Sequence, residues 1–207
     1  RSLYVQDVWA FAPHWKTVLG ARYEDWSASR GLTNFSATSS ISHPNREGSF
    51  VSPKAALSFA ARDDLVLKAS LGRAVRMPTV AELYGATSTT NSQYINDPNL
   101  RPERSLTGEL SAEKDISGGL LRATLFSEDT HDALYSQSIV DASAGNKTIT
   151  RVQNVGHIAT QGAEISYVGS DVLAKGLDLV SSLTYADSLI KENEGFVVVA
   201  GDTLNKR

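Results

Sequence analysis

The chain has 207 residues, of which 41% are hydrophobic and 21% charged, and its net charge is −3. This balance is typical neither of a disordered segment nor of a nucleic-acid-binding protein, so we expect no nucleic-acid partner. The absence of cysteine excludes a disulfide scaffold, a cysteine zinc cluster and a thiol nucleophile. No stretch approaches the roughly 18 uninterrupted apolar residues of a membrane helix. Composition alone suits a soluble all-β domain, whereas a membrane-spanning chain of this kind must span as strands.

Segments in which apolar and polar residues alternate follow one another along the chain, and each predicts a β-strand. In chain order the expected strands cover about residues 2–12, 15–28, 51–61, 65–72, 106–113, 121–128, 150–167 and 176–188. Leu106 and Leu110 share one face of their strand, and Glu109 and Glu113 share the other. With Arg122 on the next strand, these carboxylates predict a charged wall.

Short connections alternate with long ones. The short connections are 13–14, 62–64, 116–119 and 170–175, and the long ones are 29–50, 75–103, 135–149 and from 189 to the end. Short periplasmic turns and long extracellular loops are typical of outer-membrane barrels. We therefore predict an all-β fold, an antiparallel transmembrane β-barrel segment of about eight strands. Within the second long loop, the stretch from Pro78 to Tyr84 predicts a single helical turn, because proline is favoured at the first helical position.

Three motifs lie on these strands and loops. Residues 72–84 read GRAVRMPTVAELY, residues 97–105 read DPNLRPERS, and residues 154–164 read NVGHIATQGAE. They resemble motifs in the barrel of TonB-dependent outer-membrane receptors, approximately FRAPTxxELY, NPxLxPExS and NxGxAxxxGxE. The chain departs from them by Val75-Arg76-Met77 ahead of Pro78, and by Asp97 where asparagine is commonest. The resemblance predicts that residues 1–207 are part of one receptor barrel domain.

The family resemblance implies a monomeric barrel of roughly 22 strands with an N-terminal plug domain, in the bacterial outer membrane. It implies active import of a ferric siderophore or a similar large, scarce solute, energised by the inner-membrane TonB complex. The expected partners are thus the ligand, the TonB complex through the N-terminal part, and the lipid bilayer. Iron would travel as a chelate, so we expect no resident cofactor or metal site. On this reading the plug and the final strands lie outside the sequence; whether eight strands close alone stays open.

Two sets of residues are candidates for the site. Arg76, Tyr84 and Tyr94 are the candidate ligand contacts, because a guanidinium binds carboxylate, catecholate or hydroxamate oxygens and tyrosine offers an apolar ring with a polar tip. A second set belongs to the shared motifs, so we expect a structural role at the root of the loop. It comprises Arg73, Pro78, Glu82, Pro98, Leu100, Arg101, Pro102 and Glu103.

Other functions remain as alternatives. A passive porin-like channel, a small eight-stranded outer-membrane barrel and a soluble β-sandwich share the strand pattern. An outer-membrane hydrolase would use His131 as a base with a neighbouring carboxylate. We expect no enzyme, because the chain has no Gly-x-Ser-x-Gly element. A haem receptor is disfavoured because no histidine lies between Arg73 and Leu100.

Overall fold

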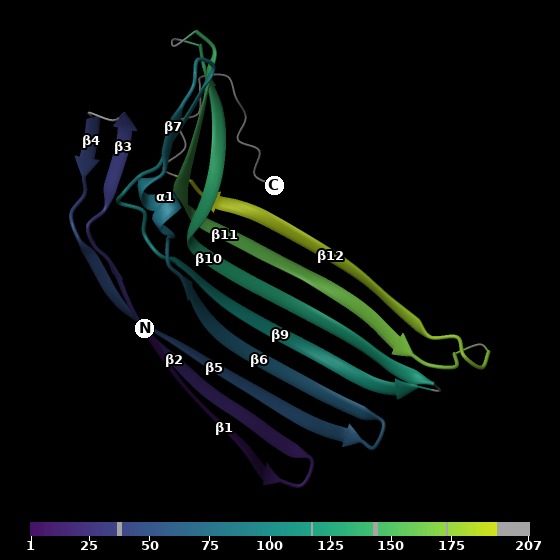
Figure 1. The fold of residues 1–207 in the computed structure, drawn as a ribbon. Coiled ribbons are helices and arrows are strands. Elements are labelled where there is room, and N and C mark those ends of the chain that lie inside the picture. The colour runs from purple at the N-terminus through teal and green to yellow at the C-terminus, as the bar shows by residue number, and fades with distance from the viewer. Residues whose placement is uncertain (37–38, 117, 143–144, 173, 194–207) are drawn as a thin grey trace.

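Eight long strands form one antiparallel sheet in the computed structural model, which describes residues 1–36, 39–116, 118–142, 145–172 and 174–193. The strands are β1 (Ser2–Ala12), β2 (Trp15–Ala28), β5 (Arg46–Arg62), β6 (Leu65–Arg76), β9 (Glu103–Ile116), β10 (Gly119–Asp141), β11 (Lys147–Gly169) and β12 (Leu179–Glu192). They pair in that order, each with its neighbours. The sheet is curled (Figure 1). The predicted fold class is confirmed.

The sheet is open in the part of the chain that the structure describes. There β1 pairs only with β2, and no ladder joins β1 to β12. A closed eight-stranded barrel needs that ladder, because closure removes both edges of a sheet. The described strands therefore form a section of wall rather than a complete small barrel.

The two faces of the sheet differ sharply in polarity. One row of directly paired residues is Leu57, Ala69, Leu110, Leu125, Ala163 and Tyr185. The adjoining row on the opposite face is Ser58, Lys68, Ser111, Thr124, Glu164 and Thr184. We call these the apolar face and the polar face. Leu110 and Leu125 are 61% and 60% exposed, so no second layer covers the apolar face among the described residues. A soluble sandwich would bury such a face between its sheets.

The polar face carries the predicted charged wall. The Glu113 carboxylate oxygens lie 2.5 Å from Lys68 Nζ and 2.7 Å from Arg122 Nη2. These two ion pairs join the three neighbouring strands β6, β9 and β10. The charged wall is confirmed for Glu113 and Arg122.

Short elements fill the first two long connections. The first holds β3 (Leu32–Ser36) and β4 (Ser39–Ser42), which form a separate hairpin. The second holds α1 (Val80–Tyr84), β7 (Ala86–Ser88) and β8 (Ser92–Ile95). No helix among the described residues has the length and apolar character to cross a membrane.

Helix α1 confirms the predicted helical turn. Its N-cap is Thr79, whose hydroxyl accepts a hydrogen bond from the Glu82 main-chain N–H, while the Glu82 carboxylate accepts one from the Thr79 N–H. This reciprocal capping box satisfies two donors that a helix N-terminus would otherwise leave free.

The third long loop was wrongly predicted. Residues 135–149 were expected to leave the sheet, but β10 and β11 stay paired from Tyr135–Gln153 up to Asp141–Lys147. This part of the hairpin carries polar residues at successive positions, such as Ser136, Gln137 and Ser138, so the alternation that marks a strand is missing. The last strand also runs further than expected, to Glu192 instead of Ser188. Most of the expected final loop, residues 194–207, lies outside the described residues.

Candidate functional site

The loop that joins β6 to β9, residues 77–102, packs on the sheet through a hydrophobic cluster. Leu83 and Leu100 are each 1% exposed. They pack with Tyr84, Leu134 and Val152, and Trp26 and Ala28 lie against this cluster. The cluster therefore joins α1 and the root of the loop to β2, β10 and β11. We call residues 77–102 the motif loop.

Arg76 is held against the start of α1. Its two terminal nitrogens lie 3.2 and 2.9 Å from the two carboxylate oxygens of Glu82, in a bidentate pair. Its Nε also lies 4.0 Å from Glu103. Because Glu82 caps α1, this pair fixes the helix to the end of β6. The guanidinium remains half-exposed, with 45% of its side chain accessible.

Tyr84 lies inside the motif loop and joins it to the first long connection. Its side chain is buried, and its ring stacks on His43 with 5.0 Å between centroids. The Thr33 hydroxyl donates a hydrogen bond of 3.0 Å to the Tyr84 carbonyl and lies 2.9 Å from His43 Nε2. At Gly31 a Cβ would lie 2.5 Å from the ring, so the ring's position requires glycine there.

Tyr94 belongs to a hydrogen-bonded group centred on Asn96. The Asn96 amide nitrogen donates to the Tyr94 hydroxyl at 2.8 Å and to the Ala81 carbonyl at 2.6 Å. Its amide oxygen accepts from the Val152 N–H at 3.0 Å. Nearby, β8 pairs in parallel with residues 148–150 of β11. Asn96 thus binds the middle of the motif loop to the edge of the sheet.

The root of the motif loop is attached by two polar side chains that bind main-chain groups. Arg46 donates hydrogen bonds of 2.7 Å to the carbonyls of Pro98 and Leu100, and its guanidinium lies 5.6 Å from the centroid of the Trp26 ring. Asn154 accepts from the Arg101 N–H at 2.7 Å and donates to the Arg101 carbonyl at 2.9 Å.

Asp132 is the buried acceptor of this region. It is 7% exposed and lies 2.7 Å from Arg101 Nη2 and 3.0 Å from Arg104 Nη2. The Asn154 amide nitrogen also donates a hydrogen bond of 2.7 Å to the main-chain carbonyl of Asp132. Beside it, Glu103 accepts from the Leu134 N–H at 2.8 Å. Two arginines therefore converge on one carboxylate where the motif loop returns to the sheet.

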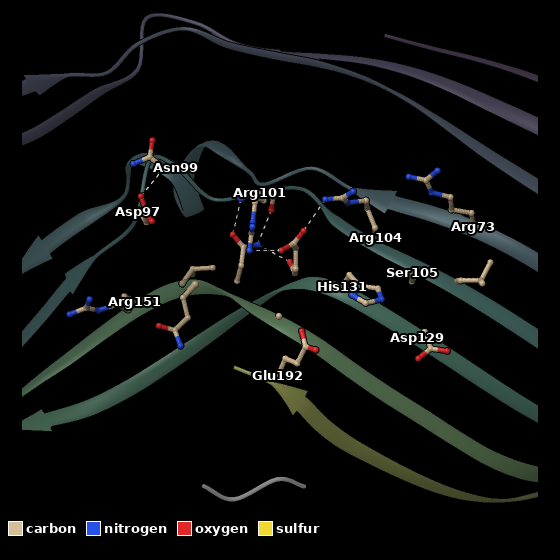
Figure 2. A pocket seen from close by; sticks show the side chains of 16 residues that line it. Arg73, Asp97, Asn99, Arg101, Arg104, Ser105, Asp129, His131, Arg151 and Glu192 are labelled. Atoms are coloured by element: carbon tan, nitrogen blue, oxygen red, sulfur yellow. Dashed lines mark hydrogen bonds and ion pairs between the residues drawn. The ribbon is translucent and has the colours of Figure 1, made fainter. Parts of the chain in front are cut away.

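An open cavity of about 1070 Å³ lies next to this point (Figure 2). Its lining is rich in charge and includes Arg73, Arg101, Arg104, Arg151, Asp129 and His131. His131 stacks on His157, with centroids 4.5 Å apart, and His157 Nε2 lies 2.9 Å from Asp129. We call this space the charged cavity.

The carboxylates near His131 are engaged elsewhere, which removes the support for a hydrolytic site. Asp129 contacts His157, Asp132 contacts two arginines, and Glu128 accepts from Thr107 and Thr130. Within the described ranges no group of three or more histidine, aspartate or glutamate side chains is placed to hold a metal ion.

The predicted structural residues lie together where the motif loop meets the sheet. Glu82, Arg101 and Glu103 act through their side chains, and Pro98 and Leu100 accept from Arg46. Pro78 is buried, Pro102 is half-buried and Arg73 is exposed at the charged cavity. The candidate ligand contacts Arg76 and Tyr94 have partners within the motif loop and Tyr84 is in its core, and ligand binding by all three stays a prediction.

Sequence reasoning missed Arg46 and Asn96, and it considered Asp132 only as a carboxylate near His131 and not as the partner of Arg101 and Arg104. Arg46 lies 52 and 54 residues from its acceptors, so no local pattern connects them. Asn154 could have been found from the sequence, because it is the first residue of the third motif.

The chain matches the family model "TonB dependent receptor-like, beta-barrel" over residues 1–206. It therefore belongs to this family, whose members are outer-membrane transporters and not enzymes.

Solved structures of a transporter and two receptors share the fold. The copper transporter OprC aligns with a TM-score of 0.72 at 17% identity, over 92% of this chain and 29% of that one. The siderophore receptor PirA from Pseudomonas aeruginosa aligns with a TM-score of 0.67 at 19% identity, over 90% and 34%. A mutant of the ferric enterobactin receptor PfeA from Pseudomonas aeruginosa aligns with a TM-score of 0.61 at 21% identity, over 89% of this chain and 26% of that one. The chain thus spans about a third or less of each.

Proposed function

We propose that these residues form part of the barrel wall of an outer-membrane receptor that imports a ferric siderophore or a similar large, scarce solute. Import is energised by the inner-membrane TonB complex, and the receptor acts as a monomer. The family match over residues 1–206 carries this proposal. The exposed apolar face supports it, because apolar side chains that point away from a barrel suit contact with hydrocarbon.

The direction of the chain across the membrane follows from its connections. The motif loop, the β3–β4 hairpin and the upper β10–β11 hairpin all lie at one end of the sheet (Figure 1). Turns of two residues, at 13–14 and 63–64, lie at the other. Long loops face the exterior in outer-membrane barrels, so the motif loop is on the side from which a solute arrives.

A ferric chelate is the cargo that the chemistry of the motif loop favours. Arg76 keeps a half-exposed guanidinium at this end of the sheet, and Tyr94 lies in the same loop with its hydroxyl fixed by Asn96. Guanidinium N–H groups and phenol hydroxyls bind the oxygen atoms of catecholate, hydroxamate or carboxylate chelators. Iron in this scheme is cargo within its chelator, so the protein needs no resident metal.

The test uses the complete receptor that contains these residues. Purified receptor is titrated with ferric catecholate, ferric hydroxamate and cupric ion, and tryptophan fluorescence reports binding. Cells that carry the receptor are then given the bound solute labelled with radioactive iron, with and without a functional TonB complex. We expect saturable binding of one ferric chelate and uptake that requires TonB. Uptake that continues without TonB would indicate a passive channel, and binding of cupric ion alone would replace the proposed cargo.

A further inference from the structure

The apolar face changes abruptly to charged side chains at the end nearest the long loops. On β6, Leu71 is followed on the same face by Arg73, and on β9, Leu106 is preceded on that face by Arg104. Leu71 and Leu106 are 54% and 48% exposed. Because strand side chains alternate between faces, both guanidinium groups leave the sheet on the side that carries the exposed leucines.

The lining of the charged cavity contains four arginines and four carboxylates, namely Arg73, Arg101, Arg104, Arg151, Asp97, Asp129, Asp132 and Glu192. Asp132 already has two arginine partners, Arg101 and Arg104. Asp129 is engaged by His157. No ion pair joins Arg73 to any other described residue, and its side chain lies apart from those of Asp97 and Arg151 in Figure 2. A guanidinium has five N–H donors, so Arg104 can bind a second anion while it contacts Asp132.

An apolar groove begins where the charged cavity ends. The groove has a volume of about 540 Å³, and Arg73 and Leu106 line both it and the cavity. Small side chains such as Ala21 and Ala55 are part of its lining. A second apolar groove of about 650 Å³ shares Ala55 and Leu71 with the first and continues along the same face. Together the cavity and the grooves are charged at one end and apolar along their length.

We propose that the charged cavity and the two apolar grooves together bind one lipid of the outer leaflet that carries a phosphate headgroup. The phosphate accepts hydrogen bonds from Arg73 and Arg104, and the acyl chains lie in the grooves past Ala55 and Leu71. Bidentate pairing with phosphate is the contact for which arginine is best suited. The proposal relies on the membrane placement given above, but it is independent of the identity of the imported solute and of TonB.

The grooves decide between a lipid and a free phosphate ion. A free ion would gain only the contacts with the guanidinium groups. A lipid also removes the apolar surface of its chains and of the grooves from contact with detergent or water, and this burial adds to affinity. We therefore expect a phosphate lipid to bind more tightly than either of its parts.

The experiment is a native mass spectrometry titration of the complete receptor, delipidated in a non-ionic detergent. The probes are phosphatidic acid, diacylglycerol with the same chains, and inorganic phosphate. We expect phosphatidic acid to give a one-to-one adduct at concentrations where the other two give none. Arg73→Glu should weaken it by about tenfold or more, as expected when a charge-assisted hydrogen bond is lost. Ala55→Phe, which fills the grooves, should also weaken it. Lys16→Glu, an equal charge change on the polar face, should not.

Several outcomes would overturn the proposal. Equal affinity of wild type and Arg73→Glu for phosphatidic acid would remove the phosphate contact. Diacylglycerol binding as well as phosphatidic acid would show nonspecific hydrophobic adsorption. Inorganic phosphate binding as well as the lipid, or no effect of Ala55→Phe, would indicate an anion site without a lipid. Heat-modifiability on gels reports folding, and if Arg73→Glu does not fold, the three wild-type titrations and Ala55→Phe still decide.

Discussion

Asn154 shows how much a single polar side chain contributes to the attachment of the motif loop. Its amide group makes three hydrogen bonds, and all three partners are main-chain groups of Arg101 and Asp132. Main-chain groups that lose a partner away from water are costly, about 1–3 kcal/mol each. One side chain therefore holds the returning end of the loop against the β10–β11 hairpin.

We predict that Asn154→Ala loosens the root of the motif loop and leaves the barrel folded. The loss should be about 1–3 kcal/mol of local stability, because water replaces part of the lost hydrogen bonding. Limited proteolysis of the folded receptor should then cleave within residues 77–102 faster than in wild type. Asn99→Ala, in which an exposed asparagine of the same loop is changed, is the matched control. Equal cleavage rates in all three proteins would contradict the assigned role of Asn154.

Arg76 allows ligand contact to be separated from support of α1. If its guanidinium contacts an anionic chelate, Arg76→Ala should weaken binding by roughly one to two decades, because a charge-assisted hydrogen bond contributes about 1.5–3 kcal/mol. Glu82→Ala breaks the same ion pair but keeps the arginine, so it should preserve or strengthen binding. Titration with the cognate ferric chelate measures both. Equal losses in the two variants would assign Arg76 to the support of α1 alone.

At this scale the sequence indicated which residues matter more clearly than what they contact. The motifs identified Glu82, Leu100 and Arg101 as candidate structural residues. Glu82 pairs with Arg76, Leu100 lies in the hydrophobic cluster and Arg101 contacts Asp132, and their structural role stays a prediction. The motifs could not supply the partners Arg46 and Asp132, because these lie far away along the chain and come near only when the sheet forms.

At the scale of the strand, the alternation of side chains determines both faces of the wall. Where one face meets hydrocarbon and the other a polar interior, every second residue must be apolar, and the pattern is visible in the sequence. Beyond the hydrocarbon this requirement ends. The upper β10–β11 hairpin keeps its hydrogen-bonded pairs up to Asp141 and Lys147 without a strict alternation. This is why eight strands could be predicted and the long upper extension of β10 and β11 could not.

Neighbouring residues of β9 should differ strongly in how much stability the same substitution costs. Leu110→Arg places a charge on the apolar face and should cost about 2–4 kcal/mol if the site lies near the middle of the bilayer. Ser111→Arg places it on the polar face and should be much milder. Urea-dependent unfolding of the complete receptor in lipid vesicles measures both variants. Similar losses would mean that both faces are buried in protein.

At the scale of the whole molecule, the described sheet has open edges, two unlike faces and two unlike ends. These three asymmetries are those of a section of barrel wall. The order of connections along the sequence was sufficient to predict the two ends. Whether the strands close alone was not predictable, because closure depends on pairing between strands that are far apart in the sequence.

Thiol labelling tests the orientation of the wall. The chain has no cysteine, so each substitution adds a single thiol to this part of the receptor. Ser39→Cys and Asn91→Cys, in the long connections, should react on intact cells with a reagent that does not cross membranes. Asp63→Cys, in a short turn, should react only after the outer membrane is permeabilised. Labelling of Asp63→Cys alone on intact cells would reverse the proposed orientation.

The motif loop is attached largely through main-chain acceptors and donors. Arg46 binds two carbonyls, Asn96 binds one carbonyl and one N–H, and β8 joins β11 through a backbone ladder. Every residue type except proline offers the same main-chain groups. Side chains at exposed positions such as 87–91 can therefore be exchanged while the attachments persist. A lineage of such receptors can acquire new solutes through changes at the loop tip, and the wall that holds the loop need not evolve with it.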